Sequence, residues 1–259
     1  MDLQLSGKTA LVTGASRGIG RAIARTLAAE GCNLHLAARS TADLELVRAE
    51  LSAVEGIKVT AHALDLSRNA DVNILGARCA DVDILVNNAG AIPFGGLVEV
   101  DAQRWRESWN LKVFGTIDLT RAIYARMRER RSGVVINVIG VSGERLRADY
   151  LIGTTGNAGL MAFTRALGGE SVDYGVRVVG VNPGKINTER MQMVLENQAE
   201  KLLGDRNRWP EMMKNAPLGR LGRPEEIADA VAFLASPRAS YISGTIVTID
   251  AGLAARNRD

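Results

Sequence analysis

Short apolar runs alternate with longer amphipathic stretches along most of the chain. Seven runs have the length of a strand and are rich in β-branched residues, and they span 8–14, 33–38, 58–64, 83–89, 133–139, 176–182 and 245–250. Most of these runs are apolar at odd and even positions alike, which is typical of parallel strands buried between two layers of helices. The stretches between them have helical spacing. The pattern therefore predicts a three-layer α/β fold with a doubly wound parallel sheet.

The segment 189–215 interrupts this alternation. It is helical in pattern, rich in Met and broken by a Trp-Pro pair, and it follows the sixth predicted strand. An insertion there lies at the carboxyl ends of the strands, where open α/β sheets bind ligands. Two interpretations stay open, a packing pair of helices and a substrate lid whose methionines adapt to ligand shape. We see no linker or repeat, so we predict one domain over 1–259 with a lid-like helical insertion at about 189–215.

The composition excludes several classes of function. Apolar residues make up 46% and charged residues 24% of the chain, as in ordinary soluble proteins, and the net charge is only +3. The densest basic run, 126–131, is interpreted as a solvated helix end and not as a nucleic-acid site. No signal peptide is recognised, and no run of ~18 apolar residues could cross a membrane. We therefore expect a cytoplasmic protein without nucleic-acid or membrane partners.

The metal-ligating residue types show no motif spacing. Cys32 and Cys79 are too few for a disulfide framework, which fits a reducing compartment. His35 and His62 fall on strand patterns, and we expect both to pack in the protein interior. No metal site is predicted.

A glycine-rich turn follows the first predicted strand and opens a helix. In the sequence TGASRGIG, Gly14 permits a tight turn, Gly18 lets backbone amides approach a pyrophosphate, and Gly20 lets the helix pack on the strand. The motif predicts a dinucleotide site at the start of the helix. The expected contacts are Gly14, Ser16, Arg17, Gly18, Ile19 and Gly20.

The end of the second strand indicates which dinucleotide binds. NAD sites usually place a carboxylate there, but this chain has Ala38, Arg39 and Ser40. Arg39, together with Arg17, can bind a 2′-phosphate through its planar guanidinium. The pattern favours NADP, and NADPH as its reduced form, over NAD. Asp65, which is followed by Leu66, either accepts a hydrogen bond from the adenine amino group or caps the next helix.

With these motifs and NNAG at 87–90, the chain resembles the short-chain dehydrogenase/reductase family over essentially its full length. The matching pieces are TGASRGIG, NNAG, WNLKVFG, VNPGKINT, GRPEEIA and YISGTIVTIDAG. The resemblance implies a seven-stranded Rossmann-like domain, NAD(P)-dependent oxidoreduction of a small molecule, and assembly as a homotetramer or homodimer. It implies that Asn110 is the helix-kinking asparagine of the catalytic set. It also implies cofactor contacts from Asn87, Ala89, Gly90, Pro183, Gly184, Ile186 and Thr188.

Three of the four catalytic positions of that family are altered here. Its members place a serine after the fifth strand, then a tyrosine, and a lysine four residues later. Alignment on the strand ending VVINVIGVSG and on the helix AGLMAFTRALGGE puts these positions at Gly140, Gly153 and Asn157. Asn157 still falls where the family contacts the cofactor. The two glycines leave a volume beside the nicotinamide, which either admits a substrate group or is filled by neighbouring side chains.

Other residues could supply the missing chemistry. Tyr150 lies seven positions before Asn157, which resembles the enoyl reductases, where the tyrosine stands further ahead of the lysine. Ser142 and Lys185 also lie near the expected site. Each has a purely structural alternative: a packing tyrosine, a turn serine and a surface lysine.

The sequence thus leaves three functions in competition. The first is a divergent NADPH-dependent reductase of a carbonyl or an activated double bond. The second is an NADP-binding protein without redox turnover, acting as a sensor or partner subunit. The third is a non-redox enzyme on the same fold, because the fold alone does not decide function.

Overall fold

A parallel sheet forms the centre of the computed structural model, which describes residues 1–214 and 216–256. The strand order is β3-β2-β1-β4-β5-β6-β7, and every neighbouring pair is parallel. The strands span β1 Thr9–Thr13, β2 Asn33–Ala38, β3 Val59–Ala63, β4 Ile84–Asn87, β5 Gly133–Val138, β6 Val176–Pro183 and β7 Ile246–Ile249. Each of the seven predicted runs coincides with a strand to within two residues at either end. The predicted doubly wound, Rossmann-like fold is confirmed.

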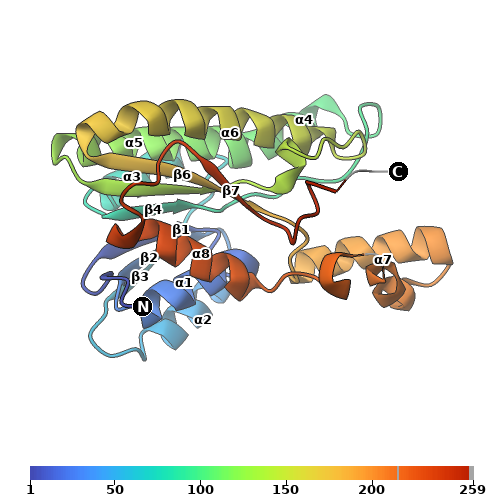
Figure 1. Ribbon diagram of the computed structural model, residues 1–259, viewed down its shortest axis with the longest axis horizontal. Coiled ribbons are helices and arrows are strands. Elements are labelled where there is room, and N and C mark those ends of the chain that lie inside the picture. Colours follow the sequence, from blue (N-terminus) through green and yellow to red (C-terminus); the bar gives the residue numbers. More distant parts are fainter. Residues whose placement is uncertain (215, 257–259) are drawn as a thin grey trace.

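Helices cover both faces of this sheet (Figure 1). One face carries α1 Gly18–Ala29, α2 Thr41–Leu51 and α8 Pro224–Ala235, and the other carries α3 Asn69–Arg78, α5 Gly115–Glu129 and α6 Leu151–Glu170, with α4 Ala102–Trp109 at its end. The strands are apolar on both sides because each face is covered by helices. In the described part of the chain, 3₁₀ helices lie in the connections at Val141–Gly143, Ser171–Tyr174, Arg206–Met213, Pro217–Gly219 and Pro237–Ala239.

A π-helical turn, Asn110–Phe114, joins α4 to α5. In it, the Gly115 amide donates to the carbonyl oxygen of Asn110. Such turns widen a helix by one residue and are frequent at functional sites. This one begins at the asparagine that the sequence predicted to kink the helix.

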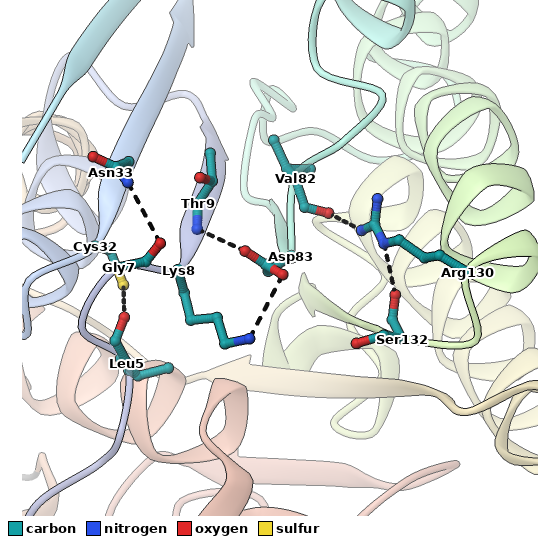
Figure 2. A network of polar contacts seen from close by, with 10 residues as sticks. All are labelled: Leu5, Gly7, Lys8, Thr9, Cys32, Asn33, Val82, Asp83, Arg130 and Ser132. Atoms are coloured by element: carbon teal, nitrogen blue, oxygen red, sulfur yellow. Dashed lines mark hydrogen bonds and ion pairs between the residues drawn. The ribbon is translucent and has the colours of Figure 1, made fainter.

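Polar contacts tie the strands together at the amino-terminal edge of the sheet (Figure 2). The Asp83 carboxylate, just before β4, accepts from the Thr9 amide at 2.9 Å and pairs with Lys8 at 3.8 Å. Arg130, after α5, donates to the carbonyls of Val82 and Ser132. Hydrogen bonds and an ion pair therefore link neighbouring segments at the amino-terminal ends of the strands. The candidate site lies at the opposite, carboxyl ends.

The predicted insertion is helical and projects from the body of the molecule (Figure 1). It consists of α7 Glu189–Leu203 and the 3₁₀ helix Arg206–Met213. The two pack through a small apolar cluster of their own that includes Leu195 and Met213. Within 1–214 and 216–256, no helix combines the length and the apolar character needed to cross a membrane.

Candidate active site

A cavity of about 870 Å³ opens at the carboxyl ends of β1 to β6. This is the edge at which open parallel sheets bind ligands. Fifteen residues that the sequence singled out line it, namely Gly14, Ser16, Arg17, Gly18, Ile19, Arg39, Ser40, Leu66, Ala89, Gly90, Tyr150, Asn157, Pro183, Gly184 and Thr188. The structure thus brings the glycine turn, the end of β2 and two of the altered catalytic positions, Gly140 and Asn157, around one volume.

The glycine turn is shaped for close approach of the backbone. Gly14 has a φ of +65°, and a Cβ on Gly20 would lie 2.2 Å from the Gly14 carbonyl oxygen. Nothing larger than glycine fits at position 20, so the start of α1 rests directly on the turn after β1. Its free backbone amides can therefore point at an anion in the cavity.

Two arginines flank the part of the cavity formed by the glycine turn and the end of β2. Arg17 precedes α1, and Arg39 follows β2. Both side chains are exposed, and neither guanidinium forms a hydrogen bond or ion pair with residues 1–214 and 216–256. Ser40 caps α2 by accepting from the Asp43 amide. No carboxylate lies at the end of β2 to compete for these arginines.

The ring of Tyr150 occupies the space in front of Gly153. A Cβ on Gly153 would come within 1.9 Å of Tyr150 Cε1 and 2.3 Å of Cζ. Tyr150 caps the start of α6, and its ring packs on Phe94 with the centroids 4.5 Å apart. A phenol therefore stands where the family tyrosine position lacks a side chain, although it comes from one helical turn earlier in the chain.

Asn157 occupies the space beside Gly140. Its Nδ2 donates to Ser142 Oγ at 2.8 Å and to the Gly140 carbonyl at 3.3 Å. Gly140 has a φ of +131°, and a Cβ there would lie 3.0 Å from Nδ2. Neighbouring side chains thus fill the volume that the two glycines leave. Asn157 Oδ1 is buried without a partner, so an acceptor remains available at the cavity.

Lys112 places a buried cation at the cavity. It lies in the π-helical turn and is only 8% exposed, and its Nζ donates to the carbonyls of Val138 at 2.8 Å and Ile139 at 3.1 Å. An ammonium has three N–H donors, so one remains after these two bonds. Burial, and to a lesser degree the charge of Arg190, lower the pKa of Lys112 to about 8.

Arg190, at the start of α7, joins this group. It donates to the carbonyls of Gly90 and Ile92, and its charge lies near enough to Tyr150 to lower the pKa of the phenol. Burial raises the pKa of Tyr150 above its usual value, although the charges of Arg190 and Arg147 oppose the shift. The Tyr150 phenol is therefore neutral at pH 7.

Four residues that the sequence predicted for the site do not line the cavity. Asn87 is buried beneath the cavity, where its Nδ2 donates to Thr120 and Asn137. The Asn110 side chain is exposed outside the cavity lining, while its carbonyl closes the π-helical turn. Ile186 packs in the core beside α8 and lines a smaller neighbouring hollow instead. Gly20 lies beneath the turn, against Gly14.

Three further residues that the sequence singled out also lie outside the cavity lining. The Asp65 carboxylate accepts from the amide and hydroxyl of Ser67 in the turn before α3, and it does not cap that helix, whose N-cap is Arg68. Ser142 faces Asn157 and lies outside the cavity lining. Lys185 lines the neighbouring hollow, and burial together with Arg147 and Arg145 lowers its pKa.

Sequence reasoning missed Lys112 and Arg190. A signal for Lys112 exists in the chain, because it stands four residues before Thr116 and seven before Leu119, on the buried stripe of α5. A charged residue on a buried stripe indicates a partner or a function. Arg190 left no such signal, because its partners are backbone carbonyls of the loop after β4.

Comparisons with known proteins identify the family of this chain. The family profile described as Enoyl-(Acyl carrier protein) reductase matches residues 14–254. The chain belongs to the short-chain dehydrogenase/reductase family. Among its relatives is the 3-oxoacyl-(acyl-carrier-protein) reductase FabG of Vibrio harveyi, which is 34% identical over 252 residues, covering 97% of this chain and 99% of the relative. The corresponding reductase of Escherichia coli K12 is 34% identical over 255 residues, covering 97% and 99%.

Solved structures of this family superpose closely. The L-sorbose reductase from Gluconobacter frateurii, complexed with NADPH and L-sorbose, matches with a TM-score of 0.90 and 30% identity over 98% of each chain. A 7α-hydroxysteroid dehydrogenase complexed with NADH and 7-oxo glycochenodeoxycholic acid matches with a TM-score of 0.86 and 28% identity, over 97% of this chain and 96% of that one. Similar folds therefore serve unlike substrates, and the substrate must be inferred from the site.

Proposed function

We propose that this protein is an NADPH-dependent reductase of a carbonyl or an activated double bond in a small molecule, with Tyr150 as the proton donor. The position of the Tyr150 ring in front of Gly153 carries the proposal. It supplies a phenol at the cavity despite the altered family position. The reductase names of the most similar relatives, FabG among them, support the same class of reaction.

The cavity fits NADPH in three respects. Gly14, Gly18 and Ile19 line the cavity around the start of α1, so backbone amides there can approach a pyrophosphate. The unpartnered guanidinium groups of Arg17 and Arg39 suit a 2′-phosphate. The orphaned Oδ1 of Asn157 can accept from a ribose hydroxyl. When bound, the dinucleotide supplies the hydride. The L-sorbose reductase structure, which contains NADPH, supports the choice.

Tyr150 would donate the proton that hydride addition requires. Its phenol is neutral because burial raises its pKa, and a neutral phenol donates to a developing alkoxide or enolate. The nearby positive charge of Arg190 stabilises the tyrosinate that remains. A neutral phenol is a poor base, so reduction is favoured over oxidation at pH 7. Oxidation should increase as pH rises towards the raised pKa.

Lys112 would support this step as a nearby cation. Its two bonds to the end of β5 fix the ammonium group at the cavity, with the third donor available. The family lysine at position 157 is replaced by asparagine, so Lys112 restores a positive charge from another helix. At a pKa of about 8 it is mostly charged at pH 7.

The first turn of α7 would contribute to substrate binding. Glu189, Arg190 and Met193 line the cavity, and Met193 is 55% exposed. A flexible apolar side chain at the mouth suits a substrate with an apolar portion. We therefore propose that the insertion acts as a lid over the substrate.

Tyr150→Phe tests the proposal, with Tyr241→Phe as the matched control because Tyr241 is fully exposed. NADPH oxidation is followed against a panel of ketones, 3-oxoacyl thioesters and enoyl thioesters, and NADPH binding is measured by calorimetry. We expect kcat to fall by roughly 10²–10⁴ in Tyr150→Phe, with unchanged NADPH affinity, and to stay constant in the control.

Two outcomes contradict the proposal in different ways. Unchanged turnover in Tyr150→Phe would show that another group supplies the proton. If NADPH binds but the whole panel gives no turnover, the protein is a nucleotide-binding module and not a reductase.

A further inference from the structure

Three potential metal ligands converge on the side of the sheet opposite α1. His35 lies on β2, His62 on β3, and Cys79 caps the end of α3. His35 Nδ1 is 2.8 Å from His62 Nε2, and Cys79 Sγ is 3.8 Å from the same Nε2. No two of the three ligand atoms are more than 4.8 Å apart. The cluster is separate from the cavity, since none of the three lines it.

These separations are close to those of a tetrahedral zinc site. Zn–N bonds of ~2.0–2.1 Å and Zn–S bonds of ~2.3 Å place two nitrogens about 3.3 Å apart and a nitrogen and a sulfur about 3.6 Å apart. The nitrogen–sulfur distance already agrees, and the two nitrogens need to separate by about half an ångström. We propose that His35 Nδ1, His62 Nε2 and Cys79 Sγ bind one Zn²⁺ ion, with water as the fourth ligand.

The donor set selects the class of metal. Two imidazoles and a thiolate suit a borderline cation such as Zn²⁺, and they are poor ligands for Mg²⁺ or Ca²⁺. Three protein ligands leave one position for water, and His35 is the half-buried member through which the ion can enter. His62 and Cys79 are 6% and 1% exposed, so the ion would be held mostly inside the protein.

Binding releases a proton, and the site gains one positive charge. Burial, and then the neighbouring His35 and Arg78, lower the pKa of His62 to about 4, so its imidazole is neutral and able to ligate. Burial raises the pKa of the Cys79 thiol to about 12. When Zn²⁺ binds, the thiol loses its proton to solvent and the Zn–S bond forms, so one proton is released per ion.

The site would secure an edge of the sheet. β3 is the outermost strand and pairs only with β2 among the described strands. One ion held by β2, β3 and the end of α3 would link these three elements next to the outermost strand of the sheet. Spacing in the sequence could not reveal the site, because its ligands come from three separate elements.

Cobalt titration of the purified full chain without dinucleotide tests this proposal. Co²⁺ substitutes for Zn²⁺, and a thiolate ligand gives a charge-transfer band in the near ultraviolet with strong visible bands from four-coordinate cobalt. Cys32→Ser is the matched control, because Cys32 is equally buried but its Sγ bonds the Leu5 carbonyl. We expect both bands in the wild type and in Cys32→Ser, and displacement of Co²⁺ by equimolar Zn²⁺.

Cys79→Ser should lose the charge-transfer band and bind Co²⁺ more weakly by over about 100-fold, since loss of even an outer-shell partner costs ~10–100-fold. His35→Gln, at the half-buried ligand, should weaken binding while leaving the fold intact. Absence of the bands in the wild type, or their persistence in Cys79→Ser, would overturn the proposal and leave a hydrogen-bonded histidine pair. These readouts do not depend on NADPH turnover, so they stand or fall separately from the proposed reductase activity.

Discussion

The ring of Tyr150 lies so close to the α-carbon of Gly153 that no side chain can be added to that glycine without moving the phenol. Gly153→Ala should therefore displace the ring, because the added methyl would come within 1.9 Å of Cε1. We expect kcat for reduction to fall nearly as far as in Tyr150→Phe. NADPH affinity should stay within about twofold, since overpacking of this kind is local.

Gly159→Ala is the control for that experiment. Gly159 lies on the same helix, and a Cβ there meets no atom within 4 Å. It should leave kcat unchanged and raise the free energy of unfolding by roughly 0.5–1 kcal/mol through helix propensity. Equal kcat values in the two alanine variants would contradict the placement of Tyr150.

The second prediction concerns the pH dependence of stability. The pKa of Lys112 is about 8 in the folded protein and 10.5 in its ordinary state. Between these values the unfolded chain binds more protons, so the contribution of Lys112 to stability increases with pH across that window. The contribution of Lys112 to the free energy of unfolding should rise by up to roughly 3 kcal/mol across this window, since one pKa unit corresponds to about 1.4 kcal/mol.

Urea unfolding of the wild type and Lys112→Met, each at about pH 7.5 and about pH 9.5, measures this effect. The wild type should gain stability relative to the variant as pH rises. Lys58→Met, at an exposed lysine, should follow the wild type. A constant difference between wild type and Lys112→Met would mean that the ammonium titrates normally.

The third prediction concerns cofactor choice. Arg39→Asp removes a phosphate partner and adds a carboxylate that can accept from the ribose 2′-hydroxyl. We expect the preference to change from NADPH to NADH in calorimetric titrations. Arg104→Asp makes the same charge change on the exposed face of α4 and should preserve the preference. Tighter NADH binding by the wild type would exclude NADPH as the cofactor.

The fourth prediction concerns assembly. β7 is an edge strand of half-buried residues, and Phe114, between α4 and α5, is 49% exposed. We expect light scattering at micromolar concentration to give twice or four times the mass of one chain. Phe114→Glu should shift the population towards smaller species, because a charge at an apolar contact opposes its burial. A monomeric wild type would refute the expectation.

The fold was predictable because its determinants are local. Runs such as 83–89 and 133–139 carry apolar residues at successive positions, and this pattern places a strand between two helical layers. The sterically tight approach of Gly20 to Gly14 follows from the spacing of the glycine turn. Topology and the position of the cavity then follow from the parallel arrangement of the sheet.

The chemistry of the site was less predictable because it depends on contacts between distant segments. The sequence indicated that Tyr150 could replace the missing tyrosine, but it left open whether substrate or neighbouring side chains fill the space at Gly153. In the structure the Tyr150 ring fills this space, and it packs on Phe94 from a distant loop. The orientation of Lys112 depends on the π-helical turn, which a regular 3.6-residue period does not describe. The Ser142 hydroxyl is turned to Asn157 by a hydrogen bond across 15 positions.

The first turn of α7 is held by the bonds of Arg190 to the carbonyls of Gly90 and Ile92, while the rest of the helix extends away from the sheet (Figure 1). The first turn of the helix is therefore fixed to the loop after β4, whereas the rest of the helix contacts the 3₁₀ helix Arg206–Met213 and can tilt together with it. The 15 residues of α7 make an arm about 22 Å long, so a tilt of about 10° would move the far end by about 4 Å. Arg190, in the first turn, would hardly shift. Substrates of different bulk could then be accommodated by swinging this arm without disturbing the alignment of the reacting groups.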